Sequence, residues 1–185
     1  DHQIKGRLLA DNVAIAPEEQ VACTDCHDPQ LHDDERINLH TDSVACQTCH
    51  IPATALKNPT KVQWDWSTAG QDLPEDHYTY LKIKGSFVYE NNYQPTYEWF
   101  NGSAAYRYLL GDTFDPSQTL VMNPPAGSID DPTAKISPFK VHVANQPYDV
   151  QNKTLLQPVT AGEGGFWSEF DWAKSFELAT QYTGL

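Results

Sequence analysis

Hydrophobic residues are patterned as in β-structure in residues 80–89, where aromatic and β-branched side chains are interrupted by Gly85. Such a composition is typical of strands, and an internal glycine favours a turn or a bulge. We therefore expect a hairpin or bulged strands here. Residues 120–158 are instead rich in proline, which lacks a backbone N–H. They are expected to form an extended strap whose backbone is satisfied by side chains or water rather than by regular ladders.

A helical pattern occupies the C-terminal end of the chain. Apolar side chains recur there at near-helical spacing, at Phe166, Phe170, Ala173, Phe176 and Leu178. Glu169 and Asp171 place negative charge in the first turns, and Gly184 can end the segment. We expect an amphipathic helix whose aromatic stripe packs against the core.

The four cysteines form two copies of one pentapeptide, Cys-x-x-Cys-His. The copies are Cys23-Thr24-Asp25-Cys26-His27 and Cys46-Gln47-Thr48-Cys49-His50. Two thiols one helical turn apart can bond to the two vinyl groups of a porphyrin as thioethers, and the next histidine then lies under the iron as its proximal ligand. The pair therefore predicts two covalently bound haem c groups, each on a short helix.

Zinc is the main alternative use of these cysteines. Cys26 and Cys46 are separated by 19 residues, which fits the spacing of a zinc ribbon. A ribbon has no use for a histidine directly after both cysteine pairs, however, and usually has a basic surface. A disulfide framework is less favoured still, because four cysteines would constrain a chain of 185 residues only sparsely. Haem is the preferred interpretation.

The chain divides chemically near Pro59. Residues 1–58 contain every cysteine, whereas residues 59–185 contain all five tryptophans and only two histidines, His77 and His142. We expect residues 1–58 to bind both haems, with residues 31–43 forming a loop between the motifs. Residues 59–185 are expected to wrap the haems, so that the two segments make one compact unit.

The charge of the chain limits its partners and its location. With 25 acidic and 12 basic residues, it should repel nucleic acid and attract basic redox partners. No apolar run approaches the ~20 residues needed to span a bilayer. Because thioether attachment takes place after export, we expect a removed signal peptide and a location in the periplasm or outside the cell.

Axial ligation separates a carrier from an enzyme. Met122 is the only methionine, whereas His2, His32, His40, His77 and His142 remain beside the two proximal histidines. Bis-histidine ligation is therefore expected for both irons, and such saturated iron exchanges electrons without offering a substrate site. His77, between acidic residues and a tyrosine-rich run, is expected to lie on the surface.

Much of the chain resembles the C-terminal portion of the octahaem tetrathionate reductase-like multihaem cytochromes c. The matching stretches begin with the first motif and continue in order through residues 36–40 (Arg-Ile-Asn-Leu-His), 44–52, 64–70 (Trp-Asp-Trp-Ser-Thr-Ala-Gly), 99–102, 127–132, 138–142 and 146–149. The resemblance implies a mostly irregular fold with short α-helices, to which the patterns above add some β-hairpin and a C-terminal helix. In that family the other haems, including a lysine-ligated catalytic haem, lie in an N-terminal part with no counterpart here. The resemblance thus implies the electron-relay end of an enzyme without its active site.

The order of histidines and motifs also resembles that of the last two haems of the pentahaem nitrite reductases. Carried over by position, His142 would complete the haem on Cys23 and Cys26, and His2 the haem on Cys46 and Cys49. His40 and His32 are the alternative distal ligands, and either could reach the iron of a neighbouring chain.

These observations predict a dihaem electron carrier whose partners are other c-type cytochromes or copies of itself, including a homopolymer such as an extracellular filament. The alternative is a haem enzyme that reduces a small sulfur or nitrogen oxyanion, which would need a vacant or lysine-ligated iron. A third hypothesis is a structural subunit whose haems serve only to hold the fold together.

Overall fold

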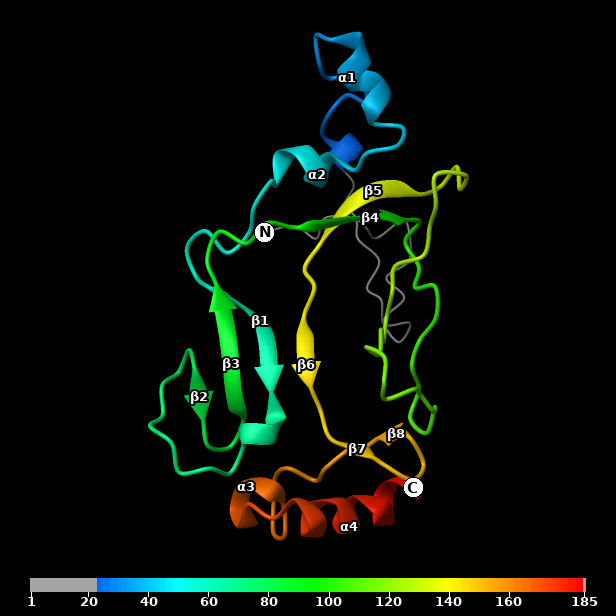
Figure 1. Cartoon of the computed structure of the whole chain (residues 1–185). Coiled ribbons are helices and arrows are strands. Elements are labelled where there is room, and N and C mark those ends of the chain that lie inside the picture. The colour runs from blue at the N-terminus through cyan, green and yellow to red at the C-terminus, as the bar shows by residue number, and fades with distance from the viewer. Residues whose placement is uncertain (1–22, 185) are drawn as a thin grey trace. The chain divides into compact units, whose positions relative to one another are not determined.

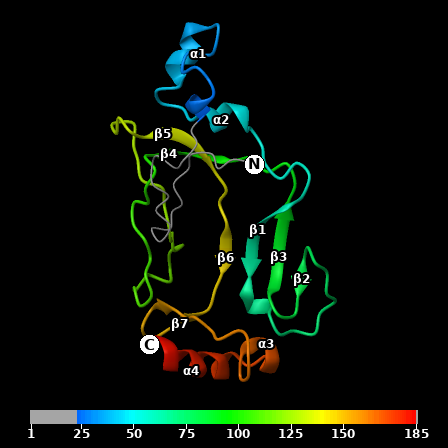
Figure 2. The ribbon, with the colours of Figure 1, turned by 180° about the vertical axis from the view of Figure 1, so that it is seen from behind.

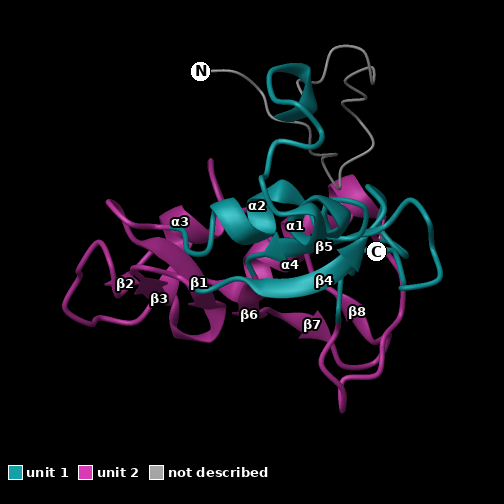
Figure 3. Ribbon diagram, turned by 90° about the horizontal axis from the view of Figure 1, so that it is seen from above, with its two compact units in different colours: residues 1–54, 94–108, 121–140 teal, residues 55–93, 109–120, 141–185 magenta. Residues whose placement is uncertain are grey.

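The computed structural model describes residues 23–184 (Figure 1). The chain forms two compact units, which Figure 3 shows in different colours. Within the described residues, unit 1 comprises 23–54, Gln94–Tyr108 and Val121–Lys140, and unit 2 comprises Ala55–Tyr93, Leu109–Leu120 and 141–184. Each unit is therefore built from three stretches that alternate along the sequence.

In its described residues, unit 1 combines three short helical elements with one β-ribbon. The helical elements are η2 (Cys23–Asp25), α1 (Glu35–His40) and α2 (Cys46–His50), and the ribbon is formed by β4 (Thr96–Phe100) and β5 (Lys135–Phe139). The two strands are antiparallel, as Figure 1 and Figure 2 show from opposite sides. Phe100 and Phe139, the last residues of the two strands, meet edge to face with ring centroids 5.2 Å apart.

Helix α1 lies where a loop was expected, in residues 31–43, so that part of the prediction was wrong. The Asp34 side chain accepts a hydrogen bond of 2.9 Å from the backbone N–H of Arg36 and thereby caps the first turn. Glu35 adds negative charge near the same helix end. The capping signal was present in the sequence, but the run of polar residues hid it.

Regular strands in the proline-rich stretch also contradict the sequence-based expectation. Four strands lie there: β5, β6 (Val143–Asn145), β7 (Tyr148–Asp149) and β8 (Thr154–Leu155). Pro138 stands opposite Tyr97 in the β4–β5 ribbon. In a two-stranded ribbon each strand has a free edge, where a residue without an N–H is tolerated. Proline excludes a central strand, but it does not exclude an edge strand.

Unit 2 contains a four-stranded sheet in the order β2 (Tyr80–Leu81), β3 (Gly85–Glu90), β1 (Thr60–Asp65) and β6. Strands β2 and β3 form the hairpin expected in residues 80–89. Strand β1 pairs antiparallel with β3, with a register shift between Lys61 and Gln63, and parallel with β6. Gly85 has φ +84, and a Cβ there would lie 2.2 Å from the carbonyl oxygen of Asp65. Only glycine fits at this crossing.

The C-terminal segment forms α3 (Phe166–Glu169) and α4 (Trp172–Thr183). The predicted helix is thus confirmed, but it is interrupted at Phe170, whose φ of 53 is left-handed. The Asp171 side chain caps α4 by accepting from the N–H of Lys174, and Gly184 ends the helix with φ 73 as expected.

The aromatic stripe of this segment packs in the core, as predicted. Phe166 is fully buried and stacks on Trp172, with centroids 3.7 Å apart. Trp172 also stacks on Phe176 and meets the edge of Trp66, which belongs to η3 (Trp66–Thr68) after β1. The buried hydroxyl of Ser175 donates to the carbonyl oxygen of Val159 at 2.6 Å. These contacts fix the helices within unit 2.

Candidate haem-binding site

Helix α2 carries the second Cys-x-x-Cys-His motif and is fixed to the β-ribbon of unit 1. The Thr48 hydroxyl and the Ala45 N–H both donate to the carbonyl oxygen of Ile136, at 2.7 Å and 3.0 Å. The N–H of Ile136 donates in turn to the carbonyl oxygen of Ser43 at 2.8 Å. The motif therefore starts from a backbone held on both sides by one residue of β5.

The first motif forms the tighter turn η2. The backbone N–H groups of Cys26 and His27 both donate to the carbonyl oxygen of Cys23, at 3.3 Å and 3.0 Å. This single turn brings the two cysteines of the motif to one side and places the histidine directly after them. Both motifs thus have local helical geometry, which porphyrin attachment requires.

One cavity of about 370 Å³ in unit 1 is bordered by both motifs. Its polar lining includes Cys23, His27, Cys46, Cys49, His50, His32 and His40, and its apolar lining includes Leu31, Ile37, Val44 and Ile51. Leu31 and Ile37 are 46% and 43% exposed, which is high for large apolar side chains. A porphyrin is apolar and needs such cover, so the residues of this cavity fit the group that the motifs would attach.

The thiols of the two motifs are neighbours within unit 1. Burial raises the pKa of the Cys23 thiol, and the adjacent Cys46 side chain, hydrogen-bonded to it, raises the pKa further. All four cysteines are free of disulfide bonds. The thiols are therefore available for thioether formation, and the two attachment points lie close together.

Of the candidate distal ligands, His32 and His40 lie in this cavity. The His32 ring is half-buried and faces that of His50, with centroids 6.0 Å apart and ring planes inclined by 27°. His142 is an exposed residue of unit 2, and His2 lies outside the described residues. His77 is exposed beside Tyr78, as expected for a surface residue.

No three histidine, cysteine, aspartate or glutamate side chains between Cys23 and Gly184 converge as a cluster that could hold a metal ion. A tetrahedral zinc site takes four such ligands. A haem iron takes at most two from the protein, because the porphyrin nitrogens occupy the other positions.

The sequence pattern of the family described as cytochrome c, bacterial, matches residues 61–185. The chain belongs to the bacterial cytochrome c family. A solved octahaem cytochrome c from Shewanella oneidensis is 45% identical, with a TM-score of 0.84 over 91% of this cytochrome and 40% of its own chain. This cytochrome therefore spans less than half of that relative. Among curated proteins, none matches it.

The family match and the motifs are independent observations. Residues 61–185 contain no cysteine, so the match does not depend on Cys-x-x-Cys-His. Both lead to the same chemistry: the cytochrome binds haem c covalently and functions in electron transfer. The resemblance to multihaem cytochromes and the mostly irregular fold class are confirmed. Within residues 23–184, none of the helices has the length and apolar character for a membrane crossing.

Sequence analysis missed the residues that support the second motif. Ile136 lies 88 positions after Thr48, and no local pattern links the two. Leu31 and Ile37 lie in residues 31–43, where a loop was expected. Leu31 directly precedes His32, and Ile37 lies three residues before His40. This closeness to histidines is the signal that could have identified them as part of the cavity wall.

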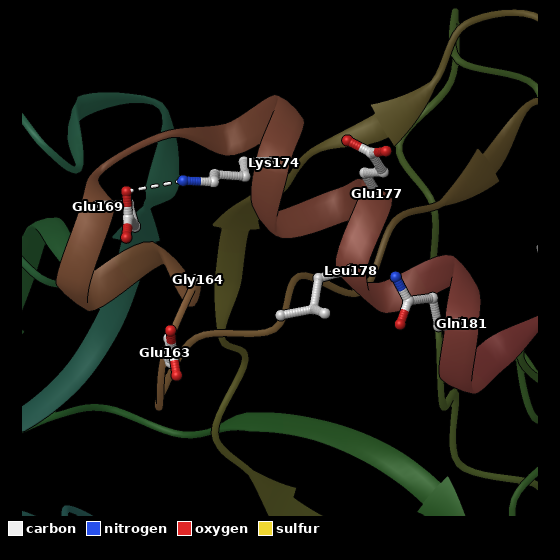
Figure 4. A pocket seen from close by; sticks show the side chains of 7 residues that line it. All are labelled: Glu163, Gly164, Glu169, Lys174, Glu177, Leu178 and Gln181. Atoms are coloured by element: carbon white, nitrogen blue, oxygen red, sulfur yellow. Dashed lines mark hydrogen bonds and ion pairs between the residues drawn. The ribbon is translucent and has the colours of Figure 1, made fainter.

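A second hollow, of about 290 Å³, lies between the helices at the end of unit 2 (Figure 4). Glu163, Glu169 and Glu177 border it, and Glu169 forms an ion pair of 2.9 Å with Lys174. Its lining includes no cysteine, so the hollow offers no attachment point for haem c.

Proposed function

We propose that this cytochrome holds two haem c groups and passes electrons between them and the haems of neighbouring cytochromes. Cys23 and Cys26 attach one haem and Cys46 and Cys49 the other, with the histidine after each pair as proximal ligand. The observation that carries the proposal is the single cavity bordered by both motifs. Two haems on the rim of one cavity are near enough to exchange electrons directly.

Both irons are bis-histidine ligated and low-spin. Such iron has no open position for a substrate, which favours a carrier over an oxyanion-reducing enzyme. By chain order, His142 completes the first haem and His2 the second, with His40 and His32 as alternatives. The cavity supports the alternatives, because the imidazoles of His32 and His40 both line it.

The cytochrome works in the periplasm or outside the cell, and its partners are c-type cytochromes with basic surfaces or further copies of itself. The net charge of −13 supports basic partners. In a homopolymer the interface would be apolar and weakly salt-dependent, because like-charged surfaces repel at low ionic strength. Light scattering across ionic strengths distinguishes a polymer from a monomer that binds other cytochromes.

The decisive experiment measures haem number and spin state on the holoprotein. Intact mass should exceed that of the polypeptide by two haems, and electron paramagnetic resonance of the oxidised protein should show only low-spin iron. One haem per chain would overturn the dihaem proposal. A large high-spin population with fast cyanide binding would overturn bis-histidine ligation and favour the haem enzyme.

A further inference from the structure

The side chain of Asn38 is bonded to His32 at three points. The backbone N–H of His32 donates to Asn38 Oδ1 at 3.0 Å, and Asn38 Nδ2 donates to the carbonyl oxygen of His32 at 2.8 Å. The Nδ1 atom of the His32 ring lies 3.3 Å from the same Oδ1. Both residues are half-buried, so the contacts are partly protected from water. Asn38 thus fixes both the backbone and the ring of His32.

These contacts determine which nitrogen of His32 carries the proton. The two backbone contacts orient the amide, because an N–H must face Oδ1 and a carbonyl must face Nδ2. Oδ1 can only accept, so in the neutral ring Nδ1 is the protonated nitrogen. Nε2 then keeps its lone pair. Histidines that bind metals typically donate their other ring N–H to a fixed acceptor in this way.

The His32 ring also lies near the proximal histidine of the second motif. The centroids of His32 and His50 are 6.0 Å apart, so a point midway lies half of that distance, 3.0 Å, from each. Both side chains border the same cavity as Cys46 and Cys49. This distance suits two imidazoles bound to opposite sides of one iron, but the rings are stacked, so one ring must turn before both direct a nitrogen at the iron.

We infer that His32 is the distal ligand of the haem on Cys46 and Cys49, opposite His50, and that Asn38 is the residue that positions it. The inference rests on the proposed function, since it takes that haem as attached. The order of histidines and motifs along the chain would assign this distal position to His2. The contacts of Asn38 favour His32 instead.

The bond from Nδ1–H to Asn38 has an electronic consequence. Donation to an acceptor makes the imidazole more basic, and a more basic ligand favours ferric iron. Removing the acceptor should raise the reduction potential of this haem. A carboxylate at the same place accepts more strongly, and should lower the potential.

The test compares holoprotein variants at both residues. His32→Ala should keep both haems by intact mass but turn one of the two irons high-spin, and added imidazole should restore the low-spin signal. Asn38→Ala should leave both irons low-spin and raise one potential, whereas Asn38→Asp should lower the same potential. Leu39→Ala, on the same helix and 63% exposed, is the control and should change neither.

Distinct outcomes separate failure of this inference from failure of the proposed function. A wild-type protein with fewer than two haems or with high-spin iron refutes the proposed function itself. Two low-spin haems that survive His32→Ala unchanged refute only the inference, and His2→Ala should then produce the high-spin iron. If His32→Ala does not mature, His32→Met retains a ligand and should raise one potential strongly. Equal shifts of potential in Asn38→Ala and Asn38→Asp would mean that Asn38 acts only on the fold.

Discussion

The hydroxyl of Thr48 donates a hydrogen bond of 2.7 Å to the carbonyl oxygen of Ile136, 88 positions further along the chain. Thr48 occupies a variable position of the second Cys-x-x-Cys-His motif, between the two cysteines. The bond therefore joins the attachment helix to β5 at the point where a haem would be held.

Replacing Thr48 by valine should lower the free energy of unfolding by about 1 kcal/mol, the net value of one hydrogen bond. The carbonyl of Ile136 keeps its second donor, the N–H of Ala45, so no buried acceptor is left unpaired. Denaturant titration of the holoprotein measures the change. Thr48→Ser keeps the hydroxyl and should lie closer to the wild type than Thr48→Val; the reverse order would show that the methyl group matters more than the bond.

Gly85→Ala should destabilise unit 2 by about 2–6 kcal/mol, through left-handed backbone strain and the displacement of β1. The new Cβ would lie 2.2 Å from a backbone oxygen, which cannot move without the strand. Gly162→Ala is the matched control, because Gly162 has φ +89 but no atom within 4 Å of the added Cβ. It should cost only about 1–2 kcal/mol. Equal losses in thermal unfolding would mean that strain alone acts at Gly85.

Phe166→Ala should cost about 3–5 kcal/mol and weaken the near-ultraviolet circular dichroism of the tryptophans. The ring is fully buried and stacks on Trp172, so its removal leaves a cavity beside the indole. Tyr182→Ala, on the same segment, removes a ring that is 78% exposed and should change stability by no more than about 0.5 kcal/mol. A small effect of Phe166→Ala would contradict the core assigned to unit 2.

Acid should destabilise unit 2 partly through Asp65. The hydroxyl of Ser67 donates to the Asp65 carboxylate and holds its pKa below the usual range, helped by the Ser67 N–H and the Asn145 amide. The unfolded chain therefore binds this proton at higher pH than the folded chain. The contribution is complete above the unfolded value, about pH 3.9, and is lost as the pH falls through the folded value. Asp65→Asn should flatten this acid limb in unfolding experiments; an unchanged slope would assign acid sensitivity to other groups.

Two different residues are candidates for the distal ligand of the first haem: His142, by the order of histidines and motifs along the chain, and His40, because it lines the cavity. Chain order predicts that His142→Ala turns the iron on Cys23 and Cys26 high-spin while both haems stay attached, because attachment depends only on the motif. His77→Ala, another exposed histidine of unit 2, should change nothing. If His40→Ala gives the high-spin signal instead, the ligand comes from the cavity wall and the assignment by chain order fails.

Sequence reasoning succeeded where the signal is local. The short helical turns at the two Cys-x-x-Cys-His motifs, the hairpin of β2 and β3, and α4 with its Gly184 cap each depend on neighbouring residues. It failed where partners are remote in the sequence. Strand β1 pairs in parallel with β6, with Gln63 opposite Val143. Strands of two or three residues are too short to show an alternating hydrophobic pattern, so the sequence does not indicate such pairing. The interruption at Phe170 escaped because apolar spacing continues across it, whereas the Asp171 cap starts a new helix.

The alternation of the two units along the chain has a consequence for the order of folding. A fragment ending at residue 58 would contain both motifs but not β5, on which α2 depends. Closing a loop of this length is entropically unfavourable and slow compared with forming a helical turn. We therefore expect haem to be attached to Cys46 and Cys49 before Ile136 forms its hydrogen bonds with this segment. The attached haem would then be the nucleus on which the later segments fold. Haem attachment, rather than chain synthesis, would be the rate-limiting step in forming the native protein.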